Sequence, residues 1–73
     1  MEGVGQRIKD LRTDNDKTQS QMAKEIGVTR KQVERWESES SEMMIGKLYD
    51  LCIKYSVSAD YILGLPKGLN WPR

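Results

Sequence analysis

Residues 18–36 restrict the possible folds most, because they hold two short helical patterns with almost no chain between them. Apolar residues recur at helical spacing in each pattern, first Met22, Ala23 and Ile26, then Val33 and Trp36. Gly27 stands between the patterns, where a glycine can take the left-handed conformation that ends a helix. Two helices joined by so short a link cross each other, and the outer face of the second stays free.

Polar residues mark where each of these two helices begins. Thr18 is the expected N-cap of the first, with Gln21 three residues later as its capping-box partner. Thr29 is the expected N-cap of the second. On this second helix Val33 and Trp36 are predicted to face the core, so its basic residues take the outer side.

Three more helices are expected around this pair. The first runs from about Gly5 to Thr13, after which residues 13–17 are polar and rich in turn formers. Another runs from about Met43 to Tyr55, and a short one follows Ser58 and ends before Gly64. The expected core stripe of the helix 43–55 is Ile45, Leu48, Leu51, Cys52 and Tyr55, with Met43 and Met44 filling gaps near its start.

These elements predict an all-α fold, a compact bundle of about five short helices that contains a helix-turn-helix. The domain is placed at residues 5–64, followed by an apolar tail at residues 65–73. The tail region leaves two interpretations open, docking onto its own domain or forming a dimer interface. The apolar residues concerned are Tyr61, Leu63, Leu65, Leu69 and Trp71.

The chain lacks the residues that several kinds of functional site usually require. The chain has no histidine, and Cys52 is its only cysteine, so we expect no metal site, no cofactor and no disulfide. No nucleophile with a base, paired carboxylates at a cleft or glycine-rich phosphate loop is apparent, which argues against an enzyme. No apolar run approaches the ~18 residues of a membrane span. The lone cysteine can form no internal disulfide, which favours a reducing cytoplasm.

The charge of the whole chain does not indicate a partner. Twelve basic and eleven acidic residues give a net charge of +1. The local pattern is more informative, because residues 29–36 carry Arg30, Lys31 and Arg35 against the single acidic residue Glu34. A basic helix face of this kind fits the major groove of DNA, although a solvated surface is the plain alternative.

The sequence resembles the phage-repressor and Cro-like helix-turn-helix domains, also called the XRE family, whose fold is lambda-repressor-like. The matching text is RIKDLRTDNDKTQSQMAKEIGVTRKQVERWES and, later, LYDLCIKYSVSADYILG, so the resemblance covers roughly residues 5–64. Features in register include the glutamine that opens the second helix, the alanine and glycine at the turn, the Trp-Glu that ends the third helix, and the closing V-S-x-D-Y-I-L-G.

This resemblance implies a cytoplasmic transcriptional regulator, more often a repressor than an activator, encoded by a prokaryote or a phage. Such domains bind double-stranded operator DNA with the third helix in the major groove, usually as homodimers. The implied DNA contacts are Gln19, Thr29, Arg30, Lys31, Gln32 and Arg35, with Gln19 on a phosphate and bracing the third helix. Arg12 and Glu37 match a structural ion pair between the first helix and the end of the third.

One segment departs from the family pattern. The loop after the third helix reads Ser38-Glu39-Ser40-Ser41-Glu42, where relatives commonly carry residues that suit a phosphate. Two carboxylates facing a phosphate would repel it, so either this loop tilts away or DNA binding is weak. The alternative to DNA binding is a protein-interaction or antitoxin-like module that uses the same helix face or the apolar tail.

Overall fold

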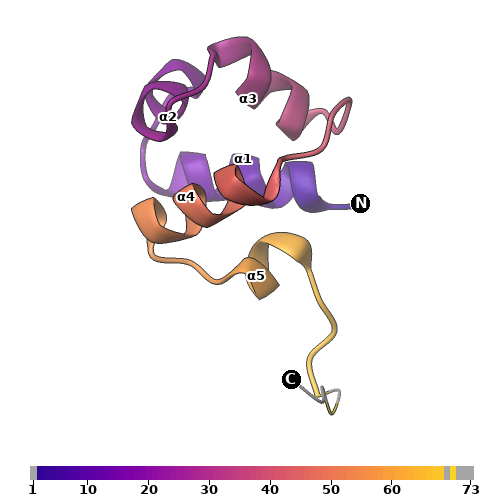
Figure 1. Ribbon diagram of the computed structural model, residues 1–73. Helices are drawn as coiled ribbons and strands as arrows, with labels where there is room; N and C mark the ends of the chain where they lie inside the picture. The colour runs from indigo at the N-terminus through magenta and orange to yellow at the C-terminus, as the bar shows by residue number, and fades with distance from the viewer. Residues whose placement is uncertain (1, 69, 71–73) are drawn as a thin grey trace.

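The structure, a computed structural model, describes residues 2–68 and residue 70. Within these residues the chain forms helices and no strand (Figure 1). In chain order they are α1 (Val4–Asp14), α2 (Gln19–Ile26), α3 (Arg30–Glu37), α4 (Ile45–Tyr55) and α5 (Ala59–Leu63). In Figure 1 α2 and α3 lie at the top, α1 and α4 cross the middle, and α5 lies below. The all-α bundle of five short helices expected from the sequence is confirmed.

The predicted helix boundaries around the turn are confirmed by their hydrogen bonds. The Thr18 side chain accepts from the Gln21 backbone NH while the Gln21 side chain accepts from the Thr18 NH, so the capping box is complete. Gly27 ends α2 at φ 75°, in the left-handed region. Thr29 caps α3 by accepting from the backbone NH of Gln32 at 3.2 Å. Local sequence therefore fixes both ends of the link between α2 and α3.

The core lies where α1, α2 and α3 meet, and α4 and α5 close it with Leu51 and Ile62. Burial of these apolar side chains is the main favourable contribution to folding. The buried hydrophobic residues are Ile8, Leu11, Met22, Ala23, Ile26, Val33, Trp36, Leu51 and Ile62. Trp36 is a core residue, as predicted, and it holds α3 against α1 and α2 from the side opposite the basic face.

The start of α4 differs from the expectation. The helix begins at Ile45 rather than near Met43, and Met44 is an N-cap without a side-chain hydrogen bond. Met43 packs against the core as expected, but Met44 is 78% exposed and Ile45 is 84% exposed. Ile45 lies at the edge of the stripe formed by the later core residues, and it falls in a first turn that precedes the packed part of the helix. Assigning it to the core was therefore wrong.

The segment after α4 is described only in part. Ser58 caps α5 by accepting from the backbone NH of Tyr61, and Gly64 ends it at φ 65°. Tyr61 is 44% exposed and Leu65 is 39% exposed, while Leu63 is half-buried. Of the residues left open between docking and dimerisation, Leu69 and Trp71 lie outside the described residues.

A cluster of three polar side chains fixes the end of α4 to α2. The Tyr55 hydroxyl donates a hydrogen bond to Glu25, and the Lys17 ammonium lies 2.9 Å from the other Glu25 oxygen. The Tyr55 hydrogen bond and the Lys17 contact both favour the ionised carboxylate and lower the pKa of Glu25.

In the described part of the chain no helix is long and apolar enough to cross a membrane.

Candidate nucleic-acid interface

The outer face of α3 carries the basic residues predicted from the sequence. Val33 and Trp36 are buried on its inner side, at 0% and 3% exposure, so Arg30, Lys31 and Arg35 are turned outward and exposed. No hydrogen bond or ion pair joins the Arg35 guanidinium to the part of the chain that the structure describes. Arg35 therefore presents all of its donors to the solvent.

The other two basic residues of α3 share one carboxylate. Arg30 Nη1 lies 2.9 Å from Glu34 Oε2, and Lys31 Nζ lies 3.2 Å from Glu34 Oε1. The hydrogen bond from Lys31 lowers the pKa of Glu34, and the bond from Arg30 adds to the effect. From the sequence, Glu34 counted only as one negative charge against three positive ones, whereas the structure places its carboxylate between two candidate DNA contacts.

Gln19, the first residue of α2, contacts both ends of α3. Its amide nitrogen donates to Glu37 Oε1 at 3.1 Å, and its amide oxygen accepts from Arg30 Nη1 at 3.3 Å. A glutamine in this position holds α3 in a fixed direction relative to α2. The resemblance implies a bracing role for Gln19, and these two bonds are the contacts that such a role would use.

Arg12 and Glu37 tie α1 to the end of α3 by a bidentate ion pair. Arg12 Nε lies 2.6 Å from Glu37 Oε2, and Arg12 Nη2 lies 3.0 Å from Oε1. Arg12 Nη1 also donates to the Lys17 carbonyl oxygen at 2.9 Å, in the turn before α2. The two side chains are only 12% and 6% exposed, and the bond to Glu37 raises the pKa of Arg12. One guanidinium thus connects α1, the turn and α3.

Gly5 brings the backbones of α1 and α3 together. A Cβ atom built on Gly5 would lie 2.8 Å from the Trp36 carbonyl oxygen and closer still to that of Glu37. Contacts this short are not found for real Cβ atoms, so only glycine permits this approach. Sequence reasoning placed Gly5 at the start of the first helix without seeing this role, because the contact joins residues more than thirty positions apart.

Gln32 and Thr29 are placed less favourably for DNA contact than the three basic residues. Gln32 is half-buried, and its amide nitrogen donates to the Ser41 hydroxyl in the following loop at 3.3 Å. The Thr29 hydroxyl oxygen is occupied as the helix cap, although the residue is exposed. Both lie near the start of α3, but their side chains first serve the local structure.

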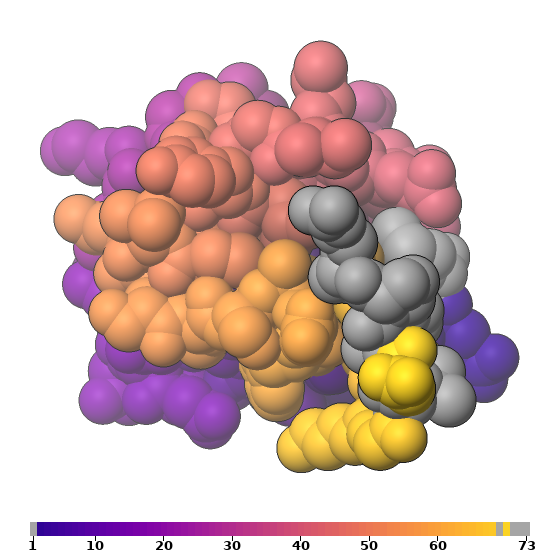
Figure 2. Space-filling view, turned by 60° about the horizontal axis from the view of Figure 1, so that its bottom comes forward, coloured from indigo at the N-terminus to yellow at the C-terminus, as the bar shows by residue number. Residues whose placement is uncertain are grey.

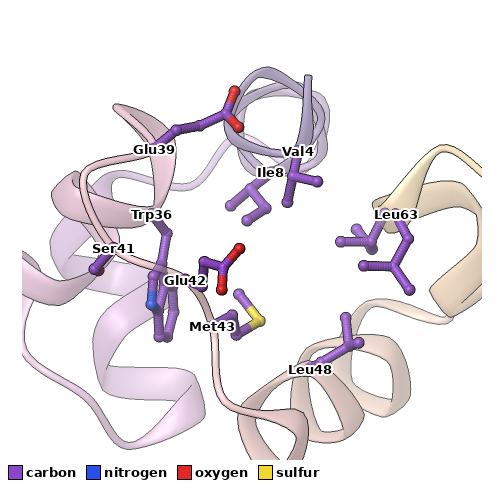
Figure 3. A pocket seen from close by; sticks show the side chains of 10 residues that line it. Val4, Ile8, Trp36, Glu39, Ser41, Glu42, Met43, Leu48 and Leu63 are labelled. Atoms are coloured by element: carbon purple, nitrogen blue, oxygen red, sulfur yellow. The ribbon is translucent and has the colours of Figure 1, made fainter. Parts of the chain in front are cut away.

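The acidic loop after α3 turns toward α1 rather than along the outer face of α3. Glu39 Oε2 accepts a hydrogen bond from the Gly3 backbone NH at 3.1 Å, just before α1 begins. In Figure 3 Glu39 extends to α1, and Glu42 points into the hollow lined by Val4, Ile8 and Met43. Two serines of the loop donate to the Arg35 carbonyl oxygen. Of the two outcomes considered, the geometry favours a loop that tilts away.

Two short helices that cross at a glycine turn, with the second braced and basic on its outer side, define a helix-turn-helix domain. The sequence matches the family described as "Helix-turn-helix domain" over residues 5–67, and the chain belongs to this family. Within the residues described, no group of three or more His, Cys, Asp or Glu residues could hold a metal ion.

Three curated proteins resemble the chain over most of its length. The uncharacterized HTH-type transcriptional regulator YobD of Bacillus subtilis (strain 168) is 40% identical over 60 residues, which cover 82% of this chain and 54% of that protein. The uncharacterized transcriptional regulator in the ATPase CF(0) region of Rhodospirillum rubrum is 34% identical over 77 residues, which cover 96% of this chain and 70% of that protein.

The third, antitoxin PezA of Streptococcus pneumoniae serotype 4, is 34% identical over 92% of this chain and 42% of that protein. The chain therefore spans about half the length of YobD and PezA.

Proposed function

We propose that this chain binds double-stranded operator DNA as the DNA-binding domain of a cytoplasmic transcriptional regulator, a repressor, with α3 in the major groove. The observation that carries the proposal is the outer face of α3, where three exposed basic side chains stand on a helix held at both ends by Gln19. An α-helix fits this groove, and its N-terminal residues contact base edges in this docking mode. The relatives named as transcriptional regulators support the same function.

The candidate contacts divide into two roles. The Arg35 guanidinium, which has no hydrogen-bond partner in the described structure, is free to donate two parallel hydrogen bonds to guanine O6 and N7. Arg30 and Lys31 must give up their bonds to Glu34 before they can bond to bases or phosphates. The free energy that they contribute to DNA binding is therefore reduced by the two ion pairs that are lost. Gln19 contacts a phosphate from the first turn of α2, where helix N-termini favour anions.

The base-reading role of Arg35 is tested by changing its shape while keeping its charge. Selection from random duplexes first identifies the preferred site, and half-sites about 10 base pairs apart are expected for a two-fold symmetric reader. Arg35→Lys should then weaken binding to that site by about tenfold, because one bidentate arginine contact gives ~1–3 kcal/mol of discrimination. Affinity for random duplex at the same salt concentration should hardly change, since the charge is retained.

Lys9→Ala is the control, because Lys9 is exposed on α1 and is assigned no base contact. It should leave sequence preference unchanged. If Arg35→Lys and Arg30→Lys weaken specific and random binding equally, or not at all, neither arginine reads a base and this function is wrong for the α3 face.

Glu34→Gln should strengthen binding to duplex DNA of any sequence by several-fold. The carboxylate holds Arg30 and Lys31 in ion pairs that DNA must break, and it repels phosphates by its own charge. The measurement is affinity for random duplex at three salt concentrations, where removal of an anion near the backbone should raise affinity most at low salt. A weaker complex with the selected site would instead show that Glu34 itself accepts from a base, as carboxylates do from cytosine N4.

A protein-binding role is the second candidate, and two observations favour it. PezA, which is 34% identical over most of the chain, is named an antitoxin. The first turns of α4 also expose large apolar side chains that the domain's own core does not use. A regulator that binds DNA through α3 and protein through another surface would combine the two functions.

A further inference from the structure

The hollow into which Glu42 points is lined mainly by apolar side chains. Helices α1, α3, α4 and α5 and the loop after α3 all contribute to its wall (Figure 3). Its apolar lining includes Val4, Ile8, Trp36, Met43, Leu48 and Leu63. Counted to its open mouth, it encloses about 450 Å³. Pockets of ~300–1,000 Å³ hold drug-sized molecules, so an aromatic side chain fits. We call this site the apolar hollow.

The apolar hollow combines incompletely covered apolar surface with negative charge. Val4, Met43 and Leu48 pack against the core but are only partly buried. Glu39 and Glu42 also line the hollow, and the described residues of its wall include no lysine or arginine. The group that suits it best therefore has a large apolar body and either a hydrogen-bond donor or a positive charge.

The segment that follows α5 has this complementary chemistry. Residues 65–73 contain the apolar Leu69 and Trp71, the basic Lys67 and Arg73, and no acidic residue. A tryptophan side chain offers a large apolar ring and a single NH donor, which usually finds an acceptor when the ring is buried. The carboxylate of a glutamate in an apolar wall is such an acceptor.

The described part of this segment lies against α1, which also lines the apolar hollow. Residues 66–68 and Arg7 of α1 line one groove. Figure 2 shows the yellow residues after α5 on the same face of the molecule as the indigo start of α1. Gly68 is in the left-handed region at φ 80°, where the chain can turn sharply. Trp71 follows Leu63 in the hollow wall by eight positions, and eight extended residues span up to about 26 Å.

We propose that residues 69–73 fold back onto their own domain, where Trp71 fills the apolar hollow and its indole NH donates to the Glu42 carboxylate. A segment joined by a short linker has an effective concentration in the millimolar range. It therefore occupies the hollow ahead of a second copy or a separate protein. Of the two interpretations left open for the tail, this proposal selects docking onto the same domain.

Docking of Trp71 joins the tail to the helices that position α3. Trp36, which holds α3 on the core, stands in the wall of the apolar hollow together with residues of α1, α4 and α5. A ring in the hollow contacts all of these elements at once, so the tail acts as a clip that closes the bundle. This proposal does not rest on DNA binding, and its test contains no DNA.

The docked position is measured on the full chain by nuclear magnetic resonance. The two indole NH signals are assigned with Trp71→Phe, and nuclear Overhauser contacts are expected from the Trp71 ring to the methyl groups of Val4 and Leu48. These contacts should keep their intensity on tenfold dilution, because docking within one chain does not depend on concentration. Trp71→Ala should lower the melting temperature by about 5 °C or more, because the apolar contacts of an aromatic side chain are lost.

The predicted bond to Glu42 is tested with Glu42→Lys, which replaces the acceptor with a cation. This variant should weaken the Trp71 contacts, and in combination with Trp71→Ala it should lower the melting temperature no further than Trp71→Ala alone. Asp14→Lys is the matched control, since it makes the same charge change on an exposed residue at the far end of α1 and should leave the Trp71 contacts intact.

Three results would overturn the proposal. The first is a Trp71→Ala protein that melts with the unmodified chain and a Trp71 ring without contacts to the hollow. The second is a set of contacts that disappears on dilution, which would place the tail in the hollow of a second copy. The third is an additive effect of Glu42→Lys and Trp71→Ala, which would show that the two side chains do not interact.

Discussion

Replacing Gly5 with alanine should destabilise the domain by about 3 kcal/mol or more, at the upper end of the ~1–3 kcal/mol typical of overpacking. The added methyl group would overlap the carbonyl oxygens of Trp36 and Glu37. These are backbone atoms at the end of α3, so no side-chain rotation relieves the overlap, and α1 must move away from α3. A domain of this size has ~5–15 kcal/mol in total. The melting temperature should therefore fall by more than about 10 °C.

Gly46→Ala is the matched control for this experiment. It makes the same chemical change in α4, where nothing lies within 4 Å of the new methyl group. Alanine is favoured over glycine in a helix by up to about 1 kcal/mol, so this variant should melt at the same or a higher temperature. Thermal unfolding followed by circular dichroism at low concentration measures both. A Gly5→Ala protein that melts within about 3 °C of the unmodified chain would contradict the close approach of α1 and α3.

The same substitution should also weaken any function of the α3 face before the domain unfolds. Gly5 lies against the last residues of α3, and the Arg12 pair holds the same end. A methyl group between the helices tilts α3 about its attachment to Gln19. We expect the loss of affinity for a selected DNA site to exceed the loss for random duplex, because base contacts depend on the direction of the helix more than phosphate contacts do.

The features that sequence predicts well in this chain are local ones. Thr18 and Gln21 satisfy each other across a single turn, and Gly27 ends α2 by its own backbone conformation. The core positions Val33 and Trp36 follow from a spacing of three residues on one helix. Each of these depends on atoms within a few residues, so the amino-acid pattern contains the required information.

The features that sequence missed depend on how helices approach one another. Ile45 has the spacing of a core residue, yet it is exposed because the first turn of α4 precedes the packed part of the helix. Glu34 lies between basic residues in the sequence, and only the side-chain geometry shows that it binds two of them. The loop glutamate Glu39 was expected to threaten DNA binding, whereas it accepts a hydrogen bond at the start of α1.

The Arg12 pair gives the second large effect. Arg12→Ala should cost about 3 kcal/mol, because removing one partner of a buried ion pair costs ~3–5 kcal/mol and leaves the other charge uncompensated. We expect the lower value of this range because the side chains of Arg12 and Glu37 are still 12% and 6% exposed, and because Gln19 still donates a hydrogen bond to Glu37. The Lys17 carbonyl also loses its donor, so the turn before α2 should loosen as well.

A double variant separates the buried charge from the lost contact. Arg12→Met combined with Glu37→Leu removes both charges and fills similar space, so it should recover more than half of the stability that Arg12→Ala loses. Arg30→Ala breaks an ion pair of the same type on the exposed side of α3, where the partners are 52% and 41% exposed, so the urea midpoint of this variant should change little. Urea unfolding of these variants and the unmodified chain measures the differences. If Arg12→Ala and Arg30→Ala shift the midpoint equally, burial does not strengthen the Arg12 pair, and α1 is held on α3 by apolar packing and the Gly5 contact alone.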